Sequence, residues 1–211
     1  MGNADALVEI RNRILLEMQC PLKDAATNLV FGKGNPEAKL MFIGEAPGKN
    51  EDLQGEPFVG QAGKQLDGLL NRIGLTLNDV YIANILKYRP PENRDPNPDE
   101  IRRHTPFLVE QIKAIKPKII ATLGNFSTKF VLADFNVDGM KAIGGITFLH
   151  GKPVEKTIDG LTFLVFPLYH PAACLYNRKL MPDLEHDFDE LGKLLGERKR
   201  QAKPQKTLEE W

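Results

Sequence analysis

The chain alternates between short unbroken hydrophobic runs and longer stretches in which hydrophobic residues recur at helical spacing. Short unbroken apolar runs are typical of strands in a parallel sheet that is covered on both faces. We therefore predict four strands, at 40–43, 80–83, 119–123 and 162–166. Alternating strands and helices predict a three-layer α/β/α fold around a central, mostly parallel, four-stranded sheet.

Amphipathic helices are predicted around these strands, because their apolar residues lie three or four positions apart. The first spans 5–17. Asn97 and Pro98 begin another, since asparagine is a favoured N-cap and proline suits the first helical position. Further helices are expected to start at Gly124 and at Pro182.

Two segments depart from this alternation. The segment 146–166 reads as extended structure with a hairpin-type turn at Asp159-Gly160. The segment 90–98 holds four prolines and is expected to be an irregular, stiff loop. We expect residues 1–196 to form a single domain, and residues 197–211 to be a charged, flexible tail whose composition disfavours packing.

Composition narrows the class of protein without indicating a function. A chain of 211 residues is long enough for one well-packed domain. Its formal net charge of zero gives no general sign of nucleic-acid binding, so a DNA-binding surface would have to be a local basic patch. No apolar stretch is long enough to span a bilayer, and two cysteines exclude a disulfide framework.

The stretch from Ile43 to Gly63 carries the densest candidate chemistry. Between a strand and a helix, glycines and prolines alternate with acidic residues and one aromatic residue, Phe58. Ligands of open α/β sheets bind at the carboxyl ends of strands, where such loops emerge. The loop lacks the glycine spacing of dinucleotide-binding and phosphate-binding loops. Taken alone it is a weak signal, because ordinary connectors also contain glycine and proline.

Candidate site residues follow three of the predicted strands. Glu45, Glu51 and Phe58 belong to the first loop, Asn84 follows the second strand, and His170 follows the last. Because the carboxyl ends of parallel strands meet at one edge of a sheet, we expect these side chains to converge.

Three segments of the chain carry distinctive motifs. In chain order, they are Gly44-Glu45-Ala46-Pro47-Gly48 with Glu51-Asp52 and Gly55-Glu56-Pro57-Phe58-Val59-Gly60; Val80-Tyr81-Ile82-Ala83-Asn84 with Lys87-Tyr88-Arg89-Pro90-Pro91; and Tyr169-His170-Pro171-Ala172-Ala173-Cys174-Leu175. Together these segments resemble the family-four uracil-DNA glycosylases. The resemblance covers about residues 20–195 and is far more specific than any single motif. It implies the fold of that family and an enzyme that removes uracil from DNA by hydrolysing the N-glycosidic bond, leaving an abasic site.

The resemblance implies a role for each matched residue. Phe58 would stack on the uracil ring, and the Asn84 carboxamide would pair with the O4 and N3–H edge, since it offers both an acceptor and a donor. His170 would donate a hydrogen bond to O2, where negative charge develops as the bond breaks. A carboxylate would orient the attacking water. Glu45 and Glu51 are both candidates, and Glu45 is favoured because it lies at the strand end.

Further residues are expected to border the base or contact DNA. Gly44 and Ala46 would lie against the base, and Ala46 stands where better-known uracil glycosylases place an aspartate. Leu175 is a candidate wedge for the gap that a flipped nucleotide leaves in the duplex. The candidate DNA-binding residues are Lys87, Arg89, Leu175 and Arg178.

The chain departs from this family at its metal site. Family-four enzymes generally hold an iron–sulfur cluster with four cysteines, and the matching positions here are Glu17, Cys20, Tyr88 and His104. One thiolate cannot hold a cluster that needs four. We therefore predict no cluster, no other metal and no cofactor, with Tyr88 and His104 filling the space by packing and hydrogen bonding.

Residues 205–211 resemble a sliding-clamp-binding box. Leu208 follows Gln205 by three residues, and Trp211 follows Leu208 by three. This spacing suits one helical turn that inserts two apolar side chains into a pocket. The second aromatic residue of the usual box is missing, and a charged tail that ends in tryptophan by chance is the alternative. Clamp binding would raise the local concentration of a repair enzyme on DNA.

Two other functions use the same residues. A protein that binds uracil in DNA without turnover would need the same pocket, so the sequence does not separate it from an enzyme. A small-molecule hydrolase or nucleotide binder could use the same loops, but it would leave Leu175 and the clamp-like box unexplained. Our prediction is the glycosylase, acting on uracil-containing DNA as a cytoplasmic, nucleoid-associated monomer.

Overall fold

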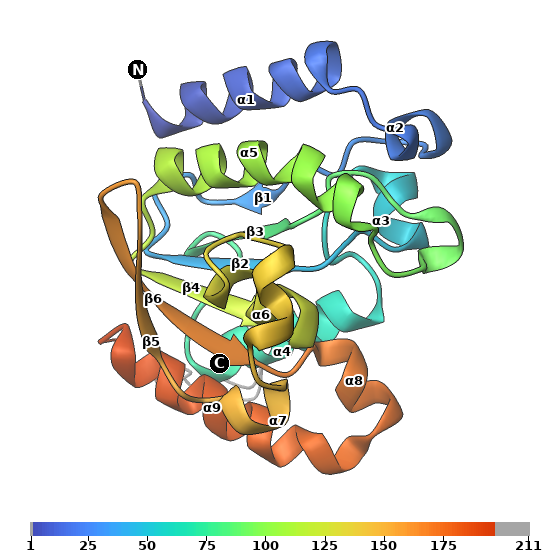
Figure 1. Cartoon of the computed structure of the whole chain (residues 1–211). Helices are drawn as coiled ribbons and strands as arrows, with labels where there is room; N and C mark the ends of the chain where they lie inside the picture. Colours follow the sequence, from blue (N-terminus) through green and yellow to red (C-terminus); the bar gives the residue numbers. More distant parts are fainter. Residues whose placement is uncertain (1, 197–211) are drawn as a thin grey trace, which may run out of the picture.

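A central sheet with helices on both faces forms the body of the protein (Figure 1). The computed structural model describes residues 2–196. The sheet has six strands in the order β1-β3-β2-β4-β6-β5. The strands are β1 (Lys33–Gly34), β2 (Leu40–Gly44), β3 (Val80–Asn84), β4 (Ile119–Leu123), β5 (Val154–Ile158) and β6 (Leu161–Leu168).

The α/β/α prediction is confirmed, with one correction to the number of strands. The four central strands are parallel and coincide with the four predicted hydrophobic runs. β1 pairs antiparallel with β3 at one edge, and β5 pairs antiparallel with β6 at the other. The Asp159-Gly160 turn joins β5 to β6, and both of its residues have the positive φ angles that a tight hairpin requires.

The helices begin largely where the sequence signals predicted. Asn97 precedes α5 and Gly124 precedes α6. The four residues 146–149 are an exception, because they form a short helix, α7, where extended structure was predicted; Asn125 Oδ1 accepts a hydrogen bond from the Ile146 N–H at its start (3.0 Å). The helices are α1 (Asn3–Glu17), α2 (Pro21–Ala25), α3 (Lys49–Gln54), α4 (Gln61–Arg72), α5 (Pro98–Ile115), α6 (Asn125–Leu132), α7 (Ile146–Leu149), α8 (Pro171–Tyr176) and α9 (Met181–Leu194), with 3-10 turns η1 (Pro91–Asn93), η2 (Asp138–Ala142) and η3 (Arg178–Leu180).

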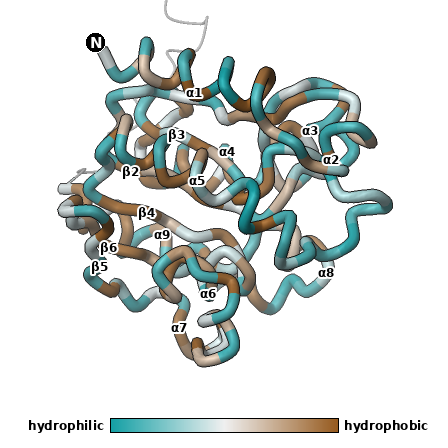
Figure 2. The backbone as a smooth tube through the Cα atoms, turned by 45° about the horizontal axis from the view of Figure 1, so that its top comes forward, coloured by the Kyte–Doolittle hydropathy of each residue, from teal (hydrophilic) through white to brown (hydrophobic). Residues whose placement is uncertain are grey.

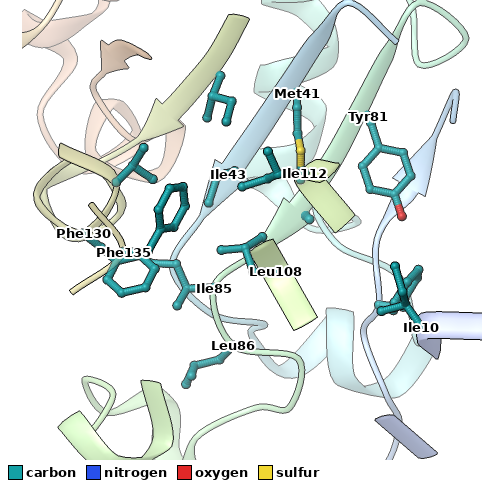
Figure 3. Close-up of a cluster of buried hydrophobic side chains, with 14 of the residues drawn as sticks. Ile10, Met41, Ile43, Tyr81, Ile85, Leu86, Leu108, Ile112, Phe130 and Phe135 are labelled. Atoms are coloured by element: carbon teal, nitrogen blue, oxygen red, sulfur yellow. The ribbon is translucent and has the colours of Figure 1, made fainter. Parts of the chain in front are cut away.

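Two hydrophobic cores lie on opposite faces of the sheet, because successive strand side chains point to opposite sides. In β2, Met41 and Ile43 join the core under α1, α5 and α6, whereas Leu40 and Phe42 join the core under α4, α8 and α9. In Figure 2, hydrophobic residues are frequent along the central strands, and hydrophilic residues are frequent where the helices face away from the sheet. Figure 3 shows Met41 and Ile43 facing Leu108 and Ile112 of α5.

The strand order predicts a site at the carboxyl ends of the parallel strands. β2 lies between β3 and β4, so the chain moves from β2 toward one side through α4 and returns toward the other side through α5. Crevices form at the carboxyl ends of strands at such a reversal. Figure 1 shows α3, α8 and the segment before α5 at the carboxyl ends of the central strands. Within residues 2–196, no helix combines the length and apolar character needed to cross a membrane.

Candidate active site

A cavity of about 420 Å³ opens at the carboxyl ends of β2 and β3 and the start of α8. Its volume is in the range of small-molecule pockets. Six of the lining residues were predicted from the sequence, and the structure brings them together from three loops: Glu45, Ala46, Glu51, Phe58, Asn84 and His170. The other lining residues are Pro47, Gly48, Ala62, Pro90, Asn93, Arg94 and Ala172.

His170 is the N-cap residue of α8, and this position fixes its tautomer. The Ala172 N–H donates to His170 Nδ1 at 3.1 Å. Because Nδ1 accepts a hydrogen bond, Nε2 carries the proton of the neutral ring. Burial lowers the pKa of His170 to about 4, although the nearby Glu51 carboxylate acts in the opposite direction. At neutral pH the cavity wall therefore holds an uncharged imidazole that can donate through Nε2.

Phe58 is held in a strained conformation next to this imidazole. Its φ of 53° lies in the left-handed region, which is unfavourable for a bulky residue. The Phe58 and His170 rings are stacked, with centroids 5.7 Å apart and planes 25° apart. Strain of this kind persists where neighbouring contacts fix the backbone.

Glu51 supplies one of those contacts. Its Oε1 accepts hydrogen bonds from the Val59 and Gly60 N–H groups, both at 3.0 Å. Gly63 supplies another, because a Cβ at this position would lie 2.0 Å from the Phe58 carbonyl oxygen. The acid and the glycine together hold the loop that carries the aromatic ring, so Glu51 has a clear structural role.

Asn84 ends β3 with its side chain in the cavity wall. The residue is buried, and its amide makes no hydrogen bond with any residue in the described range 2–196. Gly44, its partner on β2, lies beside it in the sheet and does not line the cavity. A Cβ on Gly44 would come within 2.3 Å of Asn84 Oδ1 and 3.0 Å of Phe58 Cε2. The glycine therefore allows an aromatic face and a carboxamide to approach each other closely.

Glu45 is the carboxylate without a structural hydrogen bond. It lines the cavity, and its side chain accepts none from the part of the chain that the structure describes. Burial, and to a smaller extent the negative charge of Asp95, raises the pKa of Glu45 to about 7. A carboxyl group with this pKa can accept a proton near neutral pH.

The segment after β3 supplies cavity residues that the sequence did not identify as such. Asn93 and Arg94 line the cavity, and Asp95 influences Glu45. Glu100 holds the Arg94 guanidinium through two hydrogen bonds, of 2.5 and 2.9 Å. The available signal was the stiff, proline-rich segment 90–98 at a strand end, where binding loops occur.

Lys87 is fully buried, so the prediction that it contacts DNA is wrong. Its side chain is 0% exposed. Nζ donates to the Asn84 carbonyl oxygen at 2.8 Å and to Gln111 Oε1 at 2.5 Å. Burial lowers the pKa of Lys87 to about 7. An ammonium group enclosed in this way cannot reach a phosphate.

The other three predicted DNA contacts lie near the cavity and stay predictions. Leu175 is 45% exposed in α8, the helix that His170 caps. Arg178 is exposed just beyond that helix. Arg89 is partly buried, and its Nε donates to Asn93 Oδ1 at 2.7 Å. Tyr176, next to Leu175, is 92% exposed and was not anticipated.

The four positions matched to cluster cysteines do not form a metal site. Cys20, Tyr88 and His104 are buried, whereas Glu17 is exposed and pairs with Arg13. Within residues 2–196, no three His, Cys, Asp or Glu side chains are grouped so that they could hold a metal ion. One thiol, a phenol and an imidazole are not the donor set of an iron–sulfur cluster. The Tyr88 and His104 rings pack edge to face, with centroids 6.1 Å apart.

The fold and the cavity define an α/β protein that can bind a flat, polar ring. The cavity offers an aromatic side chain for the face of the ring, a carboxamide for its amide edge and an uncharged imidazole as a hydrogen-bond donor. A family model described as the uracil DNA glycosylase superfamily matches residues 31–192. The chain therefore belongs to the uracil-DNA glycosylase superfamily.

Several relatives are similar over most of the chain. A type-4 uracil-DNA glycosylase of Archaeoglobus fulgidus is 43% identical over 92% of this chain and 96% of its own length. One of Saccharolobus solfataricus is 48% identical over 87% of this chain and 84% of its own length. One of Thermotoga maritima is 40% identical over 84% of this chain and 88% of its own length.

Substitution of two glycines in α4 tests how tightly the Phe58 loop is held. Gly63→Ala should lower the free energy of unfolding by about 1–3 kcal/mol, because its Cβ would overlap the Phe58 main chain. Gly68→Ala is the matched control, since nothing lies within 4 Å of its Cβ, and should raise stability by up to about 1 kcal/mol. Urea denaturation measures both. Equal midpoints for the two variants would contradict this account.

Proposed function

We propose that this chain is a uracil-DNA glycosylase that takes a flipped-out uracil into the cavity and hydrolyses its N-glycosidic bond. The observation that carries the proposal is the convergence of Phe58, Asn84, His170 and Glu45 on one cavity from three strand ends. Flipping the base is necessary because its reacting bond is inaccessible inside the stack. Family membership and the similar type-4 enzymes support the same activity.

Binding of the base uses two side chains with different tasks. The Phe58 ring stacks on the face of the uracil. The Asn84 amide, which has no hydrogen bond within residues 2–196, pairs with the O4 acceptor and the N3–H donor. Cytosine presents a donor and an acceptor in the reverse places and would leave a buried amide mismatched. Such mismatches discriminate strongly, since unpaired buried polar groups are costly.

Bond breaking uses His170 and Glu45. As the N1–C1′ bond breaks, its electron pair leaves with uracil, and the His170 Nε2–H donates to O2 where the negative charge develops. A neutral donor suits this task because it holds no competing buried charge. A water molecule bonds to C1′ and its proton passes to the Glu45 carboxylate. Glu45 is preferred to Glu51 for this step because Glu51 is engaged with two main-chain N–H groups.

The DNA strand is proposed to run past α8. Leu175 would fill the gap left by the flipped nucleotide, and Arg178 and Arg89 would contact phosphates. The predicted clamp-binding residues Gln205, Leu208 and Trp211 lie outside the described residues, so their contact with a sliding clamp stays a proposal from the sequence. So do the monomeric state and the cytoplasmic, nucleoid-associated location. A non-catalytic protein that traps uracil in DNA is the alternative, and release of free uracil separates the two.

Removal of either base-contacting polar group should abolish most excision. His170→Ala and Asn84→Ala should each slow single-turnover release of uracil by at least about 100-fold, because each removes a preorganised hydrogen bond. The measurement uses single- and double-stranded uracil-containing oligonucleotides, with alkaline cleavage at the abasic site. His186→Ala, an exposed histidine on α9, is the matched control and should retain full activity. Unimpaired excision by both site variants would overturn the assignment.

The pH dependence of excision should report Glu45. Because Glu45 accepts a proton only when ionised, the rate should rise between about pH 6 and pH 8, around its pKa of about 7. Asp95→Asn removes a repulsive charge, lowers the pKa of Glu45 and should shift this rise to lower pH. His170, with a pKa of about 4, stays neutral throughout this range. Glu45→Gln should excise uracil much more slowly, and its rate should no longer rise with pH. If the pH profiles of Asp95→Asn and Glu45→Gln were both identical to that of the wild type, the water-orienting role would belong to another residue.

We also propose that catalysis proceeds without an iron–sulfur cluster or other cofactor, since the donor set does not fit one. Freshly purified protein should show no broad visible absorption and no stoichiometric iron. Incubation with a chelator should leave both the melting temperature and uracil release unchanged. A brown preparation whose activity declines with the chelator would disprove this proposal.

A further inference from the structure

Lys87 is a buried amine that the proposed mechanism does not use. Lys87, His104 and Gln111 are each 0% exposed, and they come from the segment after β3 and from α5. Within residues 2–196 no carboxylate pairs with the Lys87 ammonium. Burial of a cation is unfavourable unless polar groups surround it, so the contacts of this side chain indicate what it stabilises.

Oxygen atoms from three segments surround the ammonium group. Lys87 Nζ donates to the main-chain oxygen of Asn84 at 2.8 Å, to Gln111 Oε1 at 2.5 Å and, more weakly, to the main-chain oxygen of Phe31 at 3.5 Å. Gln111 Nε2 also donates to the Phe31 oxygen, at 3.0 Å. The Lys87 amine and the Gln111 amide thus connect the segment before β1, the end of β3 and the middle of α5.

The main chain of Lys87 is fixed as firmly as its side chain. Its N–H donates to His104 Nδ1 at 2.7 Å, and its carbonyl oxygen accepts from the Val30 N–H at 2.9 Å. The ammonium therefore projects back onto β3 from a main chain that is held on both sides.

The ammonium occupies the place where the β1–β3 ladder opens. β1 pairs Lys33 with Ile82 and Gly34 with Tyr81, so extending this antiparallel register by two residues sets Phe31 opposite Asn84. The Ile85 N–H bonds to Gly44 on β2, which means that the carbonyl of Asn84, one residue earlier, faces the β1 side. Lys87 Nζ donates to the carbonyl oxygens of both residues and supplies a hydrogen bond where the ladder no longer provides one.

From this geometry we infer that Lys87 is a positioning residue that holds Asn84 in place for recognition of the pyrimidine edge. The Asn84 side chain makes no hydrogen bond with any residue that the structure describes, so its main chain determines where the amide lies. β2 fixes that main chain on one side and Lys87 fixes it on the other. This inference rests on the proposed glycosylase function.

A double-mutant cycle with Asn84 tests the inference. Lys87→Met should slow single-turnover release of uracil at least about tenfold in the wild-type background, at a temperature well below its melting temperature. In the Asn84→Ala background the same substitution should change the rate less than about twofold, because the amide that it positions is already missing. Affinity for a uracil-free oligonucleotide of the same sequence should not change, since Lys87 cannot reach DNA.

Two further variants separate positioning from a general loss of stability. Leu191→Ala, in the core under α9 on the other face of the sheet, should lower the melting temperature and leave the rate unchanged. Gln111→Met keeps the Lys87–Asn84 hydrogen bond, so it should slow release about twofold to fivefold, less than Lys87→Met. If Lys87→Met does not fold, Gln111→Met carries the same cycle with Asn84→Ala.

The outcomes are distinguishable. Equal rates for wild type and Lys87→Met, or the same tenfold loss in both backgrounds, would overturn the positioning role. If Gln111→Met replaces Lys87→Met in the double-mutant cycle, an unchanged rate of uracil release, or an equal loss in both backgrounds, would likewise overturn the positioning role. Absence of uracil release by the wild-type protein would instead refute the proposed function, and that control precedes every comparison of variants.

Discussion

The main-chain hydrogen bonds between β2 and β3 continue past the ends of both strands, and the cavity depends on this continuation. The Ile85 N–H bonds to the Gly44 carbonyl and the Leu86 N–H bonds to the Glu45 carbonyl, each at 3.0 Å. The segments that follow the two strands are thereby held together just beyond the sheet. The Glu45 carboxylate directly follows β2 and the Asn84 carboxamide ends β3, so their separation is fixed by sheet geometry rather than by loop packing.

Desolvation by the same cavity has opposite consequences for its two titratable residues. Burial disfavours the charged form of any group, so it lowers the pKa of a histidine and raises that of a carboxylic acid. His170 stays neutral down to a pH of about 4, and Glu45 exchanges its proton near pH 7. One environment therefore provides both the uncharged donor and the weak base that the proposed mechanism requires. Pairs of groups whose environments separate their protonation states are typical of acid–base sites.

The sequence predicted the central sheet because its strands are buried on both faces and read as unbroken hydrophobic runs. The edge strands lacked this signal, since β1 has two residues and β5 is mostly exposed and polar. Because the carboxyl ends of parallel strands meet, the sequence also predicted that Phe58, Asn84 and His170 lie close together. It wrongly placed Lys87 at the surface. Its burial depends on acceptors from Phe31 and Gln111, which are distant in sequence and become visible only when the fold brings them together.

Lys87 also bears on the proposal that the site works without an iron–sulfur cluster. Tyr88 Oη and His104 Nε2 are buried and have no hydrogen-bond partner within residues 2–196, so packing at these positions leaves polar groups unsatisfied, at a cost of about 1–3 kcal/mol each. The opposite ring nitrogen of His104, however, accepts the Lys87 N–H. His104, at a position that matches a cluster ligand of the family, thus holds the segment after β3 through one hydrogen bond, and Lys87 connects that segment to Asn84.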